Sequence, residues 1–106
     1  MKTILERLGY EVETSADPVE ALEFIGADPH KFDLVITDMT MPLMTGDHFA
    51  VELLKIRPEI PIILCTGYNQ EIDEERARAV GIRSYLEKPL SRKKLAAAVR
   101  QALDPN

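Results

Sequence analysis

The chain has 106 residues, enough for one hydrophobic core and too few for two, so we predict a single domain over residues 1–106. Hydrophobic residues make up 45% and charged residues 29%, a composition that excludes a disordered chain. The net charge of −5 argues against a nucleic-acid-binding surface, which requires a basic face.

The first third of the chain predicts a helix end, a strand and a second helix. Residues 2–8 are typical of the end of a helix, which Gly9 closes. Residues 10–14 alternate apolar and charged side chains, as a half-exposed edge strand does. Asp17 then predicts an N-cap, with Pro18 at the first helical position.

The rest of the chain alternates strand and helix patterns. We predict strands over residues 32–37, 62–64 and 82–86, and helices around 49–56, over 72–80 and from Ser91 onward. Strands that alternate with helices imply right-handed crossovers and a parallel sheet covered on both faces. The predicted fold class is therefore α/β, with a doubly wound parallel sheet.

Chemically useful side chains follow the predicted strands. Function in such sheets lies at the carboxyl ends of the strands, where Asp38, Thr66 and Lys88 stand. Together they offer an ionised carboxylate, a hydroxyl donor and a cation, the groups that phosphoryl transfer requires. Taken alone, Asp38 could be a turn residue, Thr66 a strand end and Lys88 a surface lysine.

A family resemblance covers nearly the whole chain. Residues 38–46, DMTMPLMTG, resemble the phosphoacceptor loop of response-regulator receiver domains, which belong to two-component signalling systems. The resemblance continues through residues 64–67, LCTG, then Tyr85, then Lys88 and Pro89. The loop at residues 66–68 and the last helix look most like receivers attached to hybrid sensor histidine kinases.

The resemblance implies a flavodoxin-like fold and a phosphorelay function. Asp38 would accept a phosphoryl group from a histidine kinase or phosphotransfer domain. Thr66 would hydrogen-bond the phosphoryl group, Lys88 would pair with it, and Tyr85 would act as the aromatic switch. The protein would be a signalling phosphoprotein and not an enzyme, catalysing at most its own phosphorylation and dephosphorylation.

The chain departs from the family at its start. Receivers open with an apolar strand that ends in two acidic residues, which hold Mg²⁺; this chain begins inside the usual first helix, as an N-terminally truncated receiver would. By resemblance, the remaining metal ligands are the Asp38 carboxylate and the Thr40 backbone carbonyl. We therefore expect weak Mg²⁺ binding, since one protein carboxylate makes a poor site.

The absent first strand also predicts an exposed sheet edge. The segment at 10–14 would then pair directly with the strand at 32–37, or the sheet would be completed by another chain. Such an edge favours a homodimer or strand exchange.

Two other functions stay open at this point. The first is a pseudo-receiver, a phosphorylation-independent protein-binding module, which the absent acidic pair favours. The second is a small α/β hydrolase or phosphatase with Asp38 as nucleophile. It would need a second aspartate close behind Asp38 as acid/base, and the nearest is Asp47, beyond Pro42 and Gly46. Cys65, as a single cysteine, fits a reducing compartment, and no apolar run approaches the ~20 residues of a membrane span. We expect a cytoplasmic protein without membrane or nucleic-acid contacts.

Overall fold

The computed structural model describes residues 2–39, 44–67, 78–82, 84–87 and 91–103. Helices and strands alternate along most of this chain, as predicted. In order they are α1 (Lys2–Arg7), α2 (Pro18–Ala27), β1 (Val35–Asp38), α3 (Gly46–Ile56), β2 (Ile62–Thr66), β3 (Ser84–Glu87) and α5 (Arg92–Leu103).

The sheet consists of parallel strands in the order β1-β2-β3 within the described residues. The central strand, β2, is buried along its whole length. Its apolar run continues through Cys65 without alternation, which is typical of a strand covered on both faces. In the register of the sheet, Asp38 lies opposite Cys65, and Thr66 lies opposite Glu87.

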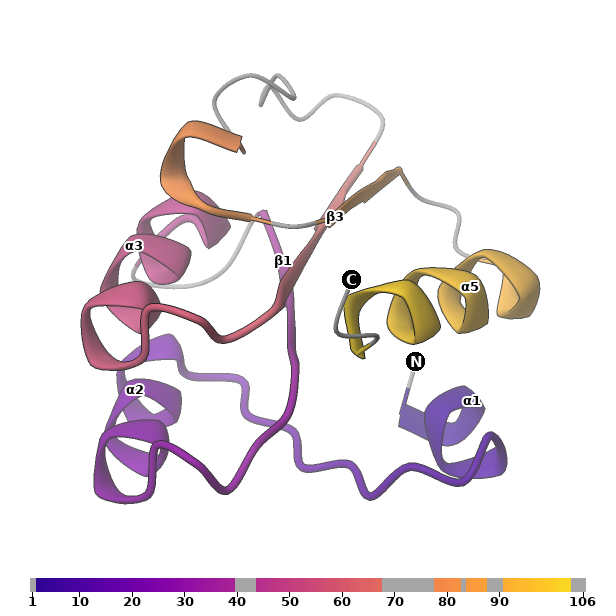
Figure 1. The fold of residues 1–106 in the computed structure, drawn as a ribbon, viewed down its shortest axis with the longest axis horizontal. Helices are drawn as coiled ribbons and strands as arrows, with labels where there is room; N and C mark the ends of the chain where they lie inside the picture. The colour runs from indigo at the N-terminus through magenta and orange to yellow at the C-terminus, as the bar shows by residue number, and fades with distance from the viewer. Residues whose placement is uncertain (1, 40–43, 68–77, 83, 88–90, 104–106) are drawn as a thin grey trace.

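Two helical layers cover the two faces of the sheet (Figure 1). Ile62 and Leu64 of β2 pack into one hydrophobic cluster, which includes residues of α2 and α3. Ile63 and Cys65 point the other way, into a cluster with residues of α1 and α5. The period-2 alternation of a strand thus divides the core in two. The predicted flavodoxin-like, doubly wound α/β class is confirmed.

Local signals in the sequence place several helix ends correctly. The Asp17 carboxylate accepts a hydrogen bond from the Val19 N–H at 2.9 Å, so Asp17 caps α2 as predicted. Ser91 caps α5 in the same way, accepting from the Lys94 N–H at 3.1 Å. Gly9 has φ +97°, the left-handed conformation that closes α1.

The predicted strand at residues 10–14 is wrong, and so is its direct pairing with the strand at 32–37. The segment has no regular secondary structure. The side chains of the segment still alternate between buried and exposed positions. Tyr10 and Val12 pack against the cluster formed with α1 and α5, while Glu11 and Glu13 are exposed. Glu13 forms an exposed ion pair with Lys31 at 3.0 Å. A strand needs a neighbour for its backbone groups, and the pattern of side chains does not supply one.

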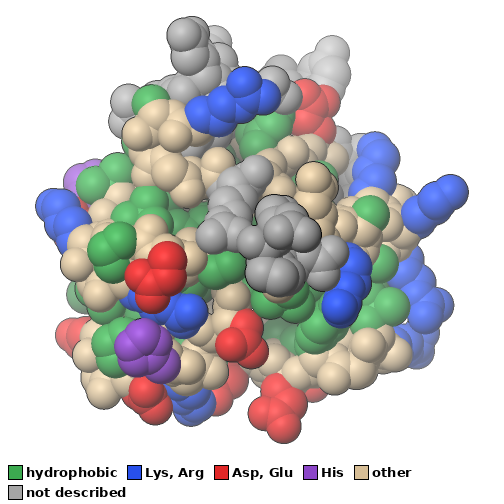
Figure 2. All heavy atoms as spheres, in the orientation of Figure 1, with side chains coloured by type: hydrophobic (Ala, Val, Ile, Leu, Met, Phe, Trp, Pro, Cys, Tyr) green, Lys and Arg blue, Asp and Glu red, His purple; other side chains and the backbone are tan. Residues whose placement is uncertain are grey.

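Other element boundaries shift by a few residues. β1 begins at Val35 and β3 at Ser84, two to three residues later than predicted. Of the predicted helix at 72–80, residues 78–80 are helical and the rest lies outside the described residues. Figure 2 shows basic side chains along the right-hand side of the molecule, the side on which Figure 1 draws α5. Three basic residues of α5, Arg92, Lys93 and Lys94, are exposed. Within the described ranges, none of the helices has the length and apolar character of a membrane span.

Candidate phosphoacceptor site

The candidate site lies at the carboxyl edge of the sheet, where β1, β2 and β3 end at Asp38, Thr66 and Glu87. Because Cys65 is the register partner of Asp38, Thr66 is the diagonal neighbour of Asp38 on the adjacent strand. Parallel-strand spacing puts such Cα atoms roughly 6 Å apart. The sheet thus brings together the strand ends that carry the predicted carboxylate and the predicted hydroxyl.

Asp38 is half-buried, and its Oδ1 atom is inaccessible to solvent. Its place is set by the backbone on both sides. The Met39 N–H donates to the Cys65 carbonyl at 2.9 Å, which continues the β1–β2 ladder past Asp38. The buried Thr37 hydroxyl donates to the Asp38 carbonyl at 3.2 Å. The carboxylate is therefore carried by a strand end whose backbone is held in place.

Thr66 is almost completely buried, with 2% of its surface exposed. Its hydroxyl donates to the Leu86 carbonyl of β3 at 3.5 Å, the outer limit for a hydrogen bond. A donor held this weakly can change partners at little cost in free energy, because the acceptor that it leaves is only loosely engaged.

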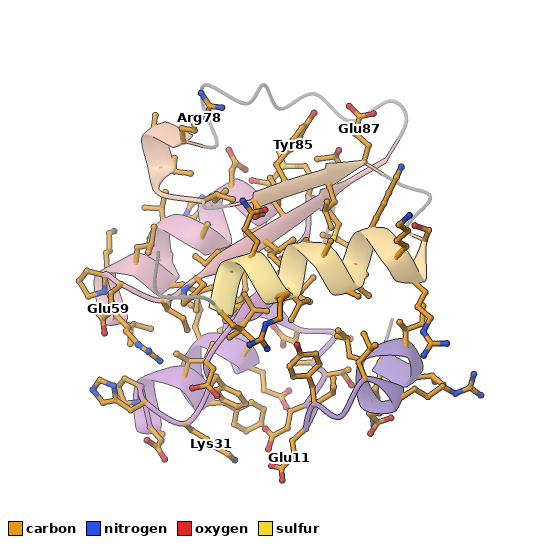
Figure 3. The ribbon with its side chains drawn as sticks, turned by 45° about the vertical axis from the view of Figure 1, so that its right-hand side comes forward. Glu11, Lys31, Glu59, Arg78, Tyr85 and Glu87 are labelled. Atoms are coloured by element: carbon orange, nitrogen blue, oxygen red, sulfur yellow. The ribbon has the colours of Figure 1, made fainter. Side chains whose placement is uncertain are left out.

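Tyr85 and Glu87 lie on the same face of β3, two residues apart. The Tyr85 hydroxyl donates to the Glu87 carboxylate at 3.4 Å, at an exposed position. Figure 3 shows both side chains pointing toward the same end of the sheet. The ring of Tyr85 also packs against the α2–α3 cluster, so it is half-buried at its base and exposed at its tip.

Two predicted site residues, Lys88 and Thr40, lie outside the described residues. Asp47, the acid that a hydrolase mechanism would need, is described: it is buried in the first turn of α3. Its carboxylate accepts a hydrogen bond from the Thr45 hydroxyl. Asp47 is thus part of the start of the helix, which weakens the hydrolase reading.

Sequence reasoning missed the contribution of Thr37. A threonine inside an otherwise apolar strand must satisfy its hydroxyl when it is buried, and that requirement could have identified it. Reasoning from motif spacing included Gly46 but did not explain it. The structure does, because Gly46 begins α3 directly against the backbone of Asp38 and Met39.

The family model for the response regulator receiver domain matches residues 1–100. The chain belongs to this family. Among curated relatives, this receiver is 40% identical over 101 residues to the transcriptional regulatory protein PdtaR of Mycobacterium tuberculosis (strain CDC 1551 / Oshkosh), covering 94% of this chain and 48% of PdtaR. It is 35% identical over 100 residues to the sensor kinase CckA of Brucella abortus (strain 2308), covering 94% of this chain and 11% of CckA. Like PdtaR and CckA, the curated relatives that the receiver matches are at least about twice its length.

Solved structures give the same family. The crystal structure of a response regulator receiver domain protein from Clostridium thermocellum superposes with a TM-score of 0.90 at 33% identity, over 96% of this chain and 81% of that one. A CheY-like receiver domain protein from Methanospirillum hungatei JF-1 gives a TM-score of 0.87 at 32% identity, over 97% of this chain and 81% of that one. The expected likeness to a sensor-kinase receiver is confirmed by CckA, beside likenesses to transcriptional regulators.

Proposed function

We propose that this receiver accepts a phosphoryl group on Asp38 from a phosphohistidine of a histidine kinase or phosphotransfer domain. A carboxylate oxygen of Asp38 would attack phosphorus, the P–N bond of the phosphohistidine would break, and the imidazole would leave as the acyl phosphate forms. The observation that carries the proposal is the position of Asp38: a half-buried carboxylate that ends β1, diagonal to Thr66 of the buried strand β2, in a chain of the receiver family.

Thr66 would supply the first response to phosphorylation. Its hydroxyl would leave the Leu86 carbonyl and donate to a phosphoryl oxygen, exchanging a long hydrogen bond for a charge-assisted one. Tyr85 would then move inward and give up its long, exposed hydrogen bond to Glu87. Lys88, the residue after β3, would pair its ammonium group with the phosphoryl charge.

Receiver domains interact with histidine kinases or phosphotransfer proteins, and on this basis we propose the same partners here. The protein would serve as a signalling module whose only catalysis is its own phosphorylation and dephosphorylation. Its output would reside in the face that includes β3 and α5, where the tip of the half-buried Tyr85 and the basic residues of α5 are exposed.

Receiver domains generally bind Mg²⁺ at the phosphorylation site. The described residues do not fit a complete magnesium site, because no group of three or more His, Cys, Asp or Glu side chains comes together among them. Asp38 and Glu87 are the described carboxylates that end strands at this edge of the sheet, and the Asp47 carboxylate accepts a hydrogen bond from Thr45.

That incomplete donor set favours a second candidate, a pseudo-receiver that binds a protein partner without phosphorylation. Addition of beryllofluoride with Mg²⁺ separates the two. A phosphoacceptor receiver should show NMR shifts of the Thr66 and Tyr85 signals, and Lys88→Ala should abolish those shifts while the protein stays folded. Unchanged spectra of the unsubstituted protein would favour the pseudo-receiver.

We also propose that a second copy of the chain pairs with the open edge of β1. Val35 and Met39 donate to carbonyls on the β2 side, at Pro61 and Cys65. By strand alternation, Ile36 directs its backbone groups to the opposite side, where the described residues contain no further strand. Light scattering over a range of concentrations should show a dimer, and a strict monomer at every concentration would contradict this pairing.

A further inference from the structure

We propose that Gly46 is a positioning residue for Asp38: its missing side chain is what allows α3 to begin against the backbone of the acceptor strand. This inference rests on the proposed phosphoacceptor role of Asp38. Gly46 touches neither a substrate nor the reacting oxygens. It would act indirectly, by fixing the position of the Asp38–Met39 peptide.

The first contact is a hydrogen bond. Gly46 is buried, and its N–H donates to the Met39 carbonyl at 2.7 Å. The same peptide region is held from the other side, because the Met39 N–H donates to the Cys65 carbonyl at 2.9 Å. Met39 thus links the first residue of α3 to the central strand, immediately after Asp38.

The second observation is the space at Gly46. A Cβ atom at this position would overlap the Asp38 carbonyl oxygen and would lie 2.9 Å from the Met39 Cα atom. Both are backbone atoms of the acceptor strand and its extension, and neither can rotate away. The same Cβ would lie 2.7 Å from Leu64 Cδ1, on a side chain with no exposed surface and therefore little room to move. Any side chain must therefore displace either the start of α3 or the Asp38 peptide.

Three other glycines, Gly9, Gly26 and Gly81, differ from Gly46 in that an added Cβ would meet no backbone atom within 4 Å. Gly9 and Gly81 have φ near +95°, so glycine is favoured there by backbone conformation. Gly46 lies in a helix and does not share that conformation, so its need is for space alone. Gly26, in α2, would meet nothing within 4 Å of an added Cβ. A single methyl group at position 46 would therefore displace the peptide that carries the proposed acceptor, Asp38.

The test compares Gly46→Ala with Gly26→Ala in the full chain. Acyl-phosphate formation from a small phosphodonor with Mg²⁺ is measured by mass spectrometry, together with the folded fraction by circular dichroism. We expect a loss of labelling rate on the order of tenfold to 100-fold in Gly46→Ala, since a displacement of about 1 Å in a reacting group has effects of this size. Gly26→Ala should label at the unsubstituted rate.

Gly46→Ala could also lower the labelling rate by destabilising the whole fold, without displacing Asp38. Arg57→Ala provides the control, because Arg57 lies past the opposite end of α3 and binds carbonyls that precede β1. If Arg57→Ala loses as much labelling rate as Gly46→Ala at an equal folded fraction, the effect is general loss of structure and the proposal is overturned. If Gly46→Ala does not fold, trimethylamine N-oxide is added to restore the compact state before labelling.

A second readout separates this proposal from the proposed function. Amide NMR signals of Asp38, Met39 and Thr66 are compared in Gly46→Ala and Gly26→Ala without any phosphodonor. Displaced signals in Gly46→Ala alone support positioning, even if the unsubstituted protein proves not to be a phosphoacceptor. Signals that match those of the unsubstituted protein, or a normal labelling rate, would overturn the role of Gly46.

Discussion

Two segments of this receiver carry strand-like sequence patterns, but only one of them forms a strand. Residues 10–14 alternate apolar and polar side chains but form no strand, whereas Ile62–Thr66 has no alternation and forms the central strand β2. Both bury side chains against the core. The difference lies in the backbone: β2 has a parallel neighbour on each side, and the described residues provide none for 10–14. A hydrophobic pattern therefore predicts burial, while a strand also requires partners for its N–H and C=O groups.

The largest expected loss of stability comes from a substitution in β2, the segment with a strand on each side. Leu64→Ala in β2 should lower the free energy of unfolding by about 2–5 kcal/mol, because Leu64 is fully buried and its removal leaves a cavity. Val12→Ala, at the half-buried segment, should cost about 1 kcal/mol or less. Urea unfolding measures both. Equal losses for the two substitutions would show that the segment at 10–14 is as firmly packed as the sheet.

A middle-sized effect is expected at the loops that lead into β1 and β2. Arg57 has a side chain that is 16% exposed, and its guanidinium donates to the Pro29 and Phe32 carbonyls. Arg57→Ala should lower the free energy of unfolding by about 1–3 kcal/mol, because these carbonyls lose their donor.

The matched control for Arg57 is Lys55, a nearby basic residue in the last turn of α3. Lys55 is 67% exposed, and its ion pair with Glu52 is of the surface type. Lys55→Ala should therefore change the free energy of unfolding by less than about 1 kcal/mol. An Arg57→Ala variant as stable as Lys55→Ala would mean that Arg57 does not hold the two loops together.

The smallest expected effect is a pH dependence beside that same arginine. A backbone hydrogen bond and then the Arg57 side chain hold the pKa of Glu59 below its ordinary value. A carboxyl with a lowered pKa stabilises the fold above its unfolded pKa, and this stabilisation is lost as the pH falls through the folded pKa. Figure 3 places Glu59 away from Tyr85 and Glu87. An NMR titration should place the Glu59 midpoint below its ordinary value and show a rise in Arg57→Ala; a midpoint that ignores Arg57 would contradict the assignment.

Much of the fold follows from the sequence because its signals are local. Asp17 and Ser91 cap helices through hydrogen bonds within three residues, and Gly9 ends α1 through its own conformation. The apolar runs before Asp38 and Thr66 predict buried strands for the same reason. The segment at 10–14 was mispredicted because a strand also depends on which segment lies beside it, and that is a property of the tertiary structure.

The candidate site was predictable only in part. The topology of alternating strands and helices places Asp38 and Thr66 on neighbouring strand ends without any knowledge of coordinates. The partners of these groups were not predictable: the Thr66 hydroxyl binds the Leu86 carbonyl, and Gly46 meets the Asp38 backbone. Such contacts depend on how neighbouring elements pack against each other, which a pattern of residue types does not encode. Lys88 and Thr40 stay predictions, because they lie outside the described residues.

The central claim is that Asp38 accepts the phosphoryl group, and radiolabel transfer from a phosphorylated histidine kinase tests it most directly. Asp38→Asn is compared with Asp33→Asn, which alters an exposed aspartate just before β1. We predict acid-stable, base-labile label in the unsubstituted protein and in Asp33→Asn, and none in Asp38→Asn. Label that persists in Asp38→Asn, or no label on the unsubstituted protein from any kinase or small phosphodonor, would contradict the account.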